Sequence, residues 1–597
     1  MSSQVCIVCA NLLPKFQVDV GVKFTSLRKI YDSAAQGCEY CQLLRTSFEA
    51  VLDAEAAERA LSESEKWSSN DARVLCEYLE DGDYAVEFFF ECPSWRLRID
   101  FWGIEGEPNP MQFITEAPVR THHASTWAAK RWIANCIENH AACGLGLPSR
   151  LPKRILNISQ PDLIFLVEPS EETRGQYACQ SYCWGDSHTV ITDASTYENH
   201  KAGISVTSLP KTFRETIAFA RSLNLQYLWI DAMCIIQDSI EDWRAEAAKM
   251  AQYYSNAYIT LAATMSASAE GGLFQPNDDI VLKNKTQTWL VRACRHLGIA
   301  DAANATLFGR GWIFQERLLS PRVIHFTTTE LCFECNHHST CECGQDMPDQ
   351  GWQVKQEYLN GPKWQVYKPT LGDTWHRMVE AYCKLQLTRG SDKLLALSGL
   401  ADQMRSRRDG ATYLAGLWSD TFLSDLVWNC RTTGRKLSPK PSQWRAPSWS
   451  WVSATDPVRY LGYPRLNIPY AKVIDVHCKY IPPSTTGEVE AGHLVIGGPS
   501  LEAVLRPTIG LYALRDQRVT MNGNFSPDYL LEGEAIDVVI LRIAKESQAR
   551  GSQYGLVLRQ LDDATYERIG LYDAPAAVGA WTEDPWDWAE NKTFKIV

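Results

Sequence analysis

The sequence lacks the short motifs that mark several common enzyme classes. It contains no G-x-x-x-x-G-K-[ST], no G-x-S-x-G, no H-E-x-x-H and no G-x-G-x-x-G. These motifs serve phosphate binding, a nucleophilic serine, a catalytic zinc ion and dinucleotide binding, respectively. Their absence argues against a P-loop ATPase, an α/β-hydrolase, a zinc protease and an ordinary dehydrogenase.

Positive charge and long apolar runs are also scarce. The chain has 59 basic against 71 acidic residues, a net charge of -12, which argues against nucleic acid as the main partner. No run of about 18 apolar residues occurs, so we expect no membrane span. The N-terminus, MSSQVCIVCANLLPKF, has no basic stretch followed by an apolar one, as a signal peptide would have. We therefore expect a cytoplasmic protein whose 19 cysteines are reduced thiols or metal ligands.

Length and composition indicate a large globular chain. At 597 residues, three to four domains of about 150 residues each are expected. Tryptophan is abundant, with 21 residues, and Trp449 and Trp451 stand among serines, which favours a groove lining for some of them. We expect four regions: a cysteine-containing α+β region (1–160), an α/β domain (161–345), a helical region (346–438) and a β-rich region (439–597).

Short apolar runs alternate with helical patterns inside the expected α/β domain. Strands are predicted near residues 163–167, 177–184, 227–230 and 257–263, with a helix opened by Leu209-Pro210 between the second and third. Strands and helices in this order predict βαβ crossovers and a parallel sheet. The intervening stretch from Ser266 to Asn304 reads as a loop-rich flank.

The stretch from Tyr227 to Tyr254 places two carboxylates near the expected ligand crevice. Asp231 ends a predicted strand, and the carboxyl ends of parallel strands open onto that crevice. Ser239 is predicted to cap the following helix, and Glu246 lies on the rim of its apolar stripe, where burial raises the pKa of a carboxyl. The alternatives are that Asp231 caps a turn and that Glu246 pairs with a basic residue.

A polar triad follows in a short predicted helix over residues 309–322. Gln315, Glu316 and Arg317 are consecutive there, and a hairpin of strands 323–326 and 331–335 comes next. Such a triad forms either a binding site or an internal salt-bridge clamp, and the clamp is the default interpretation.

Paired C-x-x-C units near the N-terminus predict a structural zinc site. Cys6 and Cys9 are followed, 28 residues later, by Cys38 and Cys41. Each pair offers two thiolates from one turn, which suits tetrahedral zinc. The alternative is that Cys38 and Cys41 are packed thiols of a helix.

Two further groups of thiols and imidazoles occur on predicted elements. Core packing is the favoured interpretation for both, with a metal site as the alternative. The first lies on a helix over residues 124–140 and just after it, and the second on the hairpin: Cys136, His140 and Cys143, then Cys332, Cys335, His337, His338, Cys341 and Cys343.

Several short sequence blocks follow one another along the chain. In order, they are Ser181-Tyr182-Cys183-Trp184-Gly185, Leu209-Pro210, Tyr227-Leu228-Trp229-Ile230-Asp231, Cys234-Ile235-Ile236-Gln237-Asp238, and Arg310-Gly311-Trp312 with residues 315–322. They resemble the successive blocks of the fungal heterokaryon incompatibility (HET) domain over about residues 177–335. Looser similarity extends to Trp132, Cys136, His140 and Cys143 before them, and to Leu387-Thr388, Asp392-Lys393 and residues 446–451 after them.

The resemblance implies a fungal intracellular protein that triggers cell death when incompatible cells fuse. HET domains have been likened to TIR domains, which have a flavodoxin-like fold, and some TIR domains cleave NAD with a glutamate on a helix beside the crevice. Glu246 is the closest positional candidate for that glutamate. The sequence departs from the family pattern at Gln180, where leucine is usual, and at Asn157, where an acidic residue is typical.

Three functions stay open: NAD cleavage, with NAD as substrate; an enzyme acting on a small organic metabolite; and a non-catalytic module that oligomerises or binds a signalling partner. In the second, Cys183 or Cys234 would be the nucleophile, with Asp186, His188, Asp231 or Glu316 as acid or base. The catalytic candidates are Glu246, Asp231, Cys183, Cys234 and Glu316. Candidates for binding a small molecule or nucleotide are Tyr182, Trp184, Asp186, Trp229, Gln237, Asp238, Arg310, Gln315 and Arg317.

Overall fold

The fold is that of a computed structural model. It describes residues 23–25, 27–51, 72–78, 84–92, 95–102, 122–185, 190–274, 280–283, 288–295, 305–328, 331–341, 349–360, 370–430, 436–461, 466–508, 511–515, 524–531, 535–546, 551–575, 586 and 589–597.

A nine-stranded sheet forms the centre of the α/β domain. Its four middle strands are parallel, and antiparallel strands continue the sheet on both sides. The predicted parallel core is therefore present within a mixed sheet. In spatial order the strands are β10 (Ile204–Ser205), β7 (Leu163–Val167), β6 (Ile155–Asn157), β11 (Tyr227–Trp229), β9 (Tyr177–Ser181), β12 (Ile259–Ala262), β15 (Arg322–Phe326), β16 (Leu331–Cys335) and β17 (Ser339–Cys341).

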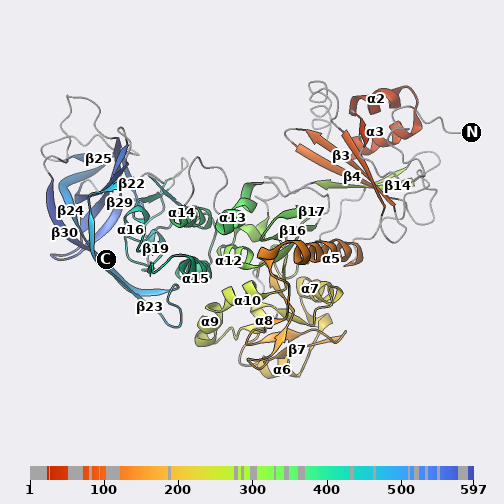
Figure 1. Ribbon diagram of the computed structural model, residues 1–597, viewed down its shortest axis with the longest axis horizontal. Coiled ribbons are helices and arrows are strands. Elements are labelled where there is room, and N and C mark those ends of the chain that lie inside the picture. Colours follow the sequence, from red (N-terminus) through yellow and green to blue (C-terminus); the bar gives the residue numbers. More distant parts are fainter. Residues whose placement is uncertain are drawn as a thin grey trace, which may run out of the picture.

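Helices cover both faces of this sheet. Side chains alternate between the two faces along β9 and the residue that follows it, and they contact both helix layers. Tyr177 donates a hydrogen bond of 2.6 Å to the Tyr253 carbonyl on one face, while the Tyr182 ring, just after the strand, contacts Phe213 on the other. Figure 1 shows the two helix layers. The first layer contains α10 (Met250–Asn256) and α12 (Gly311–Leu319), and the second contains α7 (Lys211–Ser222) and α5 (His122–Asn139).

The helix predicted to follow Ser239 is broken into two pieces, α9 (Ile240–Ala247) and α10, and a short helix that was not predicted, α8 (Asp231–Cys234), precedes them. The predicted cap at Ser239 is confirmed, because its hydroxyl accepts a bond of 3.2 Å from the Asp242 amide. Asp242 also pairs with Arg154, whose side chain is buried. These contacts fix the start of α9 close to the end of strand β11.

The smaller elements of the domain connect these parts. They are β5 (Ser149–Arg150), paired with β8 (Arg174–Gly175), the helix α6 (Tyr197–Ala202), and the single-turn helices η1 (Ala141–Cys143), η2 (Val206–Ser208) and η3 (Thr306–Gly309).

The N-terminal sheet is completed by strands from inside the α/β domain. Its order is β1 (Lys23–Thr25), β2 (Ala72–Tyr78), β3 (Tyr84–Cys92), β4 (Trp95–Trp102), β14 (Thr288–Arg295) and β13 (Ile280–Lys283), beside the helices α2 (Leu27–Ala35) and α3 (Glu39–Val51). β13 and β14 belong to the stretch predicted as a loop-rich flank. The pairing of β14 with β4 is a long-range contact that the local sequence pattern does not reveal.

The helical region connects the α/β domain to the C-terminal strands. It contains α13 (Asp349–Asn360), α14 (Leu371–Tyr382), η4 (Gly390–Lys393), η5 (Leu395–Leu397), α15 (Ser398–Arg407) and α16 (Phe422–Asp425). Two small sheets belong to this part of the chain. One is a hairpin before α16, β18 (Tyr413–Leu414) with β19 (Leu417–Trp418), and the other pairs β20 (Trp428–Cys430) with β21 (Val458–Tyr460), with η6 (Trp451–Ser453) between them in sequence.

The predicted β-rich C-terminal region is present. Strand β24 pairs with both β27 and β30, so the sheet closes on itself. Its strands are β22 (Leu466–Pro469), β27 (Ile536–Glu546), β28 (Ser552–Gln560), β29 (Tyr566–Pro575), β30 (Glu590–Ile596), β24 (Val489–Thr508) and β23 (Lys472–Tyr480), with β25 (Leu511–Arg515) and β26 (Asn524–Pro527) beside them.

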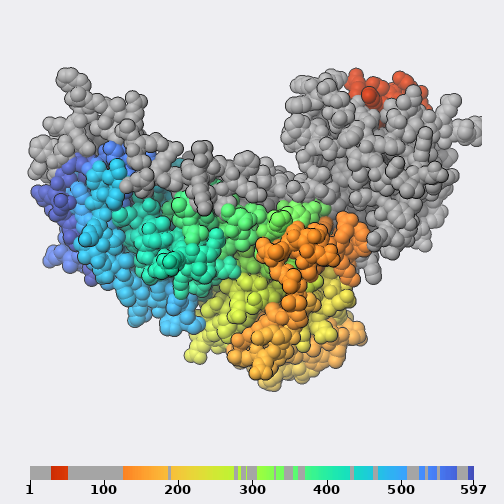
Figure 2. All heavy atoms as spheres, viewed as in Figure 1, coloured from red at the N-terminus to blue at the C-terminus, as the bar shows by residue number. Residues whose placement is uncertain are grey.

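One apolar core runs from α5 through the helical region to β30. Figure 2 shows the described atoms of these parts as one continuous body. The groove predicted for Trp449 and Trp451 is wrong, because both side chains are fully buried. The Trp451 indole donates a bond of 3.0 Å to the Gly416 carbonyl, and the neighbouring serines bond to backbone groups rather than to solvent. None of the described helices combines the length and the apolar character needed to cross a membrane.

Candidate functional site

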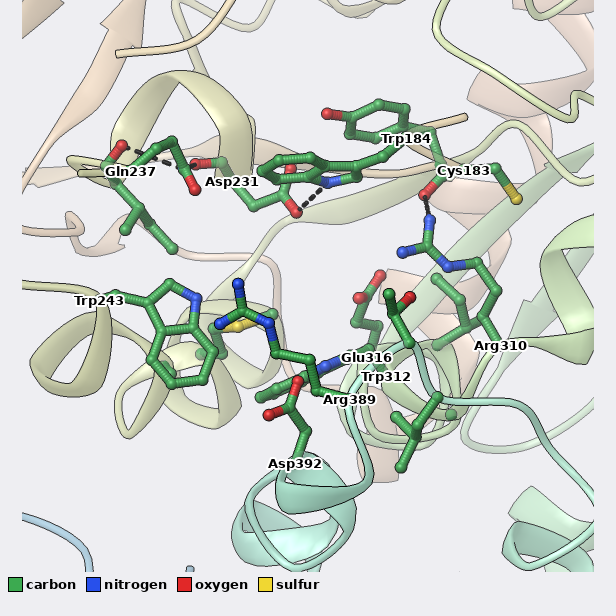
Figure 3. Close-up of a pocket in the computed structure, with 18 of the residues that line it drawn as sticks. Cys183, Trp184, Asp231, Gln237, Trp243, Arg310, Trp312, Glu316, Arg389 and Asp392 are labelled. Carbon is green, nitrogen blue, oxygen red and sulfur yellow. Dashed lines mark hydrogen bonds between the residues drawn. The ribbon is translucent and has the colours of Figure 1, made fainter. Parts of the chain in front are cut away.

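A cavity of about 1010 Å³ opens at the carboxyl ends of β9 and β11. One wall comes from the α/β domain, and the other comes from the segment between α14 and η4 of the helical region (Figure 3). Parallel sheets bind ligands at this end of their strands. The polar and aromatic side chains that line the cavity include Tyr182, Cys183, Trp184, Asp231, Gln237, Asp238, Trp243, Arg310, Trp312, Glu316, Arg389 and Asp392.

Asp231 is held in a fixed orientation at the cavity. The Trp184 indole donates a hydrogen bond of 2.7 Å to its Oδ2, and the Ala232 amide donates one of 2.7 Å to its Oδ1. Burial raises the pKa of Asp231, and these two bonds lower it again. Asp231 thus lies where the sequence predicted a carboxylate, with both oxygens positioned.

Glu316 is the carboxyl group best placed to exchange a proton near neutral pH. Its side chain is only 6% exposed, and Ser181 donates a hydrogen bond of 2.7 Å to its Oε2. Burial raises the pKa of Glu316 to about 7, helped by the charge of Asp231 and opposed by Ser181 and Arg310. A carboxyl with such a pKa can act as general acid or base at physiological pH.

Arg310 brings a positive charge to the same wall. It lies immediately before α12, and its Nη1 donates a bond of 3.1 Å to the Tyr182 carbonyl, across the end of strand β9. The next residue, Gly311, donates a bond of 2.7 Å to the Gln386 carbonyl. A Cβ at Gly311 would lie 2.6 Å from the Leu387 side chain, so a larger residue here would require Leu387 to move.

Two tryptophans of the α/β domain and a pair of charged residues on the opposite wall complete the lining. The Trp243 and Trp312 rings have centroids 6.4 Å apart and are nearly perpendicular. Arg389 and Asp392 come from the helical region, and burial raises the pKa of Asp392. None of these four was predicted as a site residue. The similarity of Leu387-Thr388 and Asp392-Lys393 to family sequences was the available signal for this wall.

Most of the predicted ligand-binding residues line the cavity. Besides Tyr182, Trp184 and Arg310, Gln237 lies there and donates a bond of 3.0 Å to the Asp231 carbonyl. The Asp238 carboxylate is exposed and accepts bonds of 3.1 and 3.2 Å from the Ala194 amide.

Glu246 and Trp229 are not among the residues that line the cavity. Glu246 is buried, where it accepts a bond of 2.8 Å from the Tyr253 hydroxyl and pairs with Lys249 at 3.3 Å. Trp229 is fully buried and packs against the rings of Tyr253 and Tyr254. Both residues therefore hold α9 and α10 against the sheet.

The polar triad on α12 divides among three directions, because each residue rotates about 100° around a helix. Gln315 accepts a bond of 2.7 Å from the Gly399 amide, and Glu316 faces the cavity. Arg317 forms two bonds of 2.8 and 3.1 Å with Glu334 on β16, which lower the pKa of Glu334 to about 2. The default interpretation as a clamp thus fits Arg317, and the site interpretation fits Glu316.

Both thiols proposed as nucleophiles are buried, and burial favours the protonated form of a thiol. Cys183 lines the cavity but is only 4% exposed, and burial raises its pKa. Cys234 is fully buried away from the cavity, and burial raises its pKa to about 12. Because the thiolate is the nucleophile, both positions disfavour it at neutral pH. Asp186 and His188 lie outside the described residues.

The described residues bring together one set of thiols and imidazole that could hold a metal ion. It contains Cys136, His140, Cys143 and Cys335, whose ligand atoms all lie within 4.8 Å of one another. The set thus joins the helix group to the hairpin group. Of the C-x-x-C cysteines, Cys38 and Cys41 are buried at the start of α3, and Cys6 and Cys9 lie outside the described residues.

The comparison with known families agrees with this geometry. A family model described as heterokaryon incompatibility protein (HET) matches residues 177–316. No curated protein and no solved structure matches the chain. The matched range begins at β9 and ends at Glu316, so it includes Asp231 and Glu316 but not Asp392 of the cavity. Residues 177–316 of this chain are therefore a heterokaryon incompatibility (HET) domain.

Proposed function

We propose that this protein acts in incompatibility-type cell-death signalling by cleaving a nicotinamide nucleotide in the cavity of its HET domain. The HET domain itself implies the signalling family. The observation that carries the enzymatic part is Glu316, a buried carboxyl with a pKa of about 7 beside Asp231 and Arg310.

The arrangement of the parallel strands supports a nucleotide-binding fold. In chain order β9, β11, β12 and β15 are the first to fourth parallel strands, and they stand in the spatial order second, first, third, fourth. This is the order at the beginning of flavodoxin-like sheets, which bind their ligand at the carboxyl ends of the strands. The cavity lies at that end.

The lining supplies the groups that such a ligand needs. The Trp243 and Trp312 rings offer flat surfaces for a base, and Arg310 and Arg389 offer cations for phosphates. When the bond between the ribose and nicotinamide breaks, its electron pair leaves with nicotinamide and positive charge develops on the ribose. Asp231, oriented by Trp184, would stabilise that charge, as carboxylates do in glycoside hydrolysis.

Glu316 would then complete the reaction as a general base. A water molecule adds its oxygen to the ribose carbon and gives a proton to the Glu316 carboxylate. The pKa of about 7 keeps a large fraction of Glu316 ionised at neutral pH. Glu246 has the weaker claim to this role, because its carboxylate is engaged by Tyr253 and Lys249 away from the cavity.

The test is nicotinamide release by the purified full chain incubated with NAD. Glu316→Gln should reduce the rate by about 10²- to 10⁴-fold, the usual contribution of a general base. Glu246→Gln is the matched control, since it neutralises another buried glutamate on the same face of the sheet, and it should keep most of the activity.

Two other results would redirect the proposal. Quenching of tryptophan fluorescence by NAD without nicotinamide release would favour a non-catalytic module that senses a nucleotide. If millimolar NAD causes no quenching and no nicotinamide is released, NAD is excluded as the ligand, and this result would favour a different small organic metabolite.

A further inference from the structure

We propose that Cys136, His140, Cys143 and Cys335 bind one structural zinc ion at the edge of the HET-domain sheet. All four ligand atoms lie within 4.8 Å of one another, and the Cys335 sulfur is 3.4 Å from His140 Nδ1. A tetrahedral zinc ion with bonds of about 2.3 Å to sulfur and 2.0 Å to nitrogen separates its ligands by less than about 4 Å. The four side chains therefore need only small rotations to reach that geometry.

The backbone around Cys335 is arranged to stabilise a thiolate. The amides of His337 and His338 each lie 3.4 Å from its sulfur and donate hydrogen bonds to it. The Cys335 amide donates a bond of 2.9 Å to the His338 carbonyl, which closes the turn on itself. Hydrogen bonds from outside the ligand set orient metal ligands and hold their charge.

The other three ligands come from one helix end. His140 lies one residue after α5, and its amide donates a bond of 3.0 Å to the Cys136 carbonyl. The Cys143 amide then donates one of 2.9 Å to the His140 carbonyl, so the single turn η1 brings Cys143 back towards Cys136. The short spacings between these ligands suit one tetrahedral ion.

A buried arginine beside the cluster would be stabilised by negative charge on the cluster. Arg322 is 1% exposed, and its Nη2 donates bonds of 3.0 and 2.6 Å to the carbonyls of Cys143 and Gly144. Among the residues that the structure describes, it forms no ion pair with a carboxylate. A buried cation without a counter-ion is costly. Three thiolates around a divalent ion carry a net charge of -1, which would balance Arg322.

The ligand types identify the metal as zinc and its role as structural. Thiolates together with imidazole select zinc over the harder magnesium and calcium ions. Four protein ligands also leave no open position for a water molecule or a substrate, as catalytic zinc requires.

The site would fasten two parts of the chain that are 195 positions apart at His140 and Cys335. One part is the end of α5, which covers the sheet, and the other is the outer hairpin strand β16. Direct contacts between the described residues also join these parts. Asn336 donates a bond of 3.0 Å to the Ala142 carbonyl, Arg322 on the other strand of the hairpin bonds to the carbonyls of Cys143 and Gly144, and the Trp132 ring stacks on Phe333. The ion would thus reinforce an attachment that these contacts begin at this edge of the sheet.

The test measures metal content and metal coordination on the purified full chain. Elemental analysis should find one zinc ion that is lost in both Cys143→Ser and Cys335→Ser. The control variant Cys9→Ser with Cys41→Ser removes one thiol from each C-x-x-C pair and should keep this ion. A second buried thiol control, Cys383→Ser, should also leave the zinc content unchanged.

A measurement on the unchanged cluster guards against variants that fail to fold. X-ray absorption at the zinc edge of the Cys9→Ser, Cys41→Ser chain should show three sulfur neighbours and one nitrogen neighbour. An average of four sulfur neighbours, no bound zinc, or unchanged zinc in folded Cys335→Ser protein would overturn the proposal. The NAD assay is independent of these results, because no ligand of this site lines the cavity.

Discussion

Two buried glutamates, one at the cavity and one behind it, behave in opposite ways. Glu316 is 6% exposed and has a pKa raised to about 7, whereas Glu334 is 2% exposed and has a pKa lowered to about 2. Burial raises the pKa of both, so burial does not explain the difference. Glu334 is bonded twice by Arg317, while Glu316 accepts a bond from the neutral Ser181 hydroxyl.

The difference teaches that one short helix serves two purposes. Arg317 on α12 neutralises Glu334 and so holds the hairpin of β15 and β16. Glu316, one residue earlier, is left without a bonded cation at the wall of a cavity. A charge that is satisfied inside the protein stabilises the fold, whereas one left partly unsatisfied is available to a ligand.

Breaking the clamp should have the largest effect on stability. Arg317→Met would leave Glu334 buried without its main partner, and we expect a loss of about 3–5 kcal/mol in the free energy of unfolding. Urea unfolding at pH 7 measures it. The double variant Arg317→Met, Glu334→Gln should recover most of the loss. A loss below about 1 kcal/mol would show that the nearby charge of Lys355 and the hydrogen bond of His325 suffice for Glu334.

The two glutamates should also give stability opposite dependences on pH. The folded protein holds the Glu316 proton up to about pH 7, and the unfolded chain releases it near the ordinary value of 4.5. Glu316 therefore lowers the stability of the wild type as the pH rises from 4.5 to 7. The free energy of unfolding of Glu316→Gln should exceed that of the wild type by about 3 kcal/mol at pH 8 and should equal it at pH 4.

Glu334 provides the contrasting arm of that experiment. Its folded pKa of about 2 lies below the ordinary 4.5, so its contribution is present above pH 4.5 and is lost as the pH falls towards 2. Glu334→Gln should flatten the acid side of the stability curve and leave the slope between pH 5 and 7 unchanged. The same slope change in both variants would contradict the distinction between the two groups.

The smallest expected effect concerns the hydroxyl that tunes Glu316. Ser181→Ala removes the bond of 2.7 Å that lowers the pKa of Glu316, so that pKa should rise by up to about one unit at a cost of about 1 kcal/mol. Because Glu316 must be ionised to act as a base, the acidic limb of the pH profile of nicotinamide release should move to higher pH. Thr260→Val, which removes another buried hydroxyl bond at 2.7 Å, should leave the profile in place.

The sequence predicted the parts of the fold that local patterns encode. The strands β7 and β16 match their predicted bounds, and the cap at Ser239 and the carboxylate at the end of β11 are present. The pairing of β14 with β4 could not be predicted from the sequence, since that contact joins distant segments.

The site was predictable to the same extent. Asp231, Arg310 and Glu316 belong to the sequence blocks that resemble the HET family, and all three line the cavity. The spacing along a helix could not tell Glu246 from Glu316, because which face meets the cavity depends on tertiary packing. Cys143 and Cys335 were placed in separate groups because only the folded sheet edge brings them together.

The match to the family model ends at residue 316, in the middle of helix α12. This end point limits which segment of the chain could be moved by recombination and still fold. Residues 177–316 include three of the four parallel strands but omit β15, the clamp and the proposed zinc ligands. The same range contains the paired strands β13 and β14, whereas β4, the other partner of β14, lies upstream. A recombination event or a truncation that moved only this segment would leave β14 without β4 and β12 without β15, and such open strand edges favour aggregation. The recognisable segment is thus not a transferable unit, and the surrounding chain must travel with it.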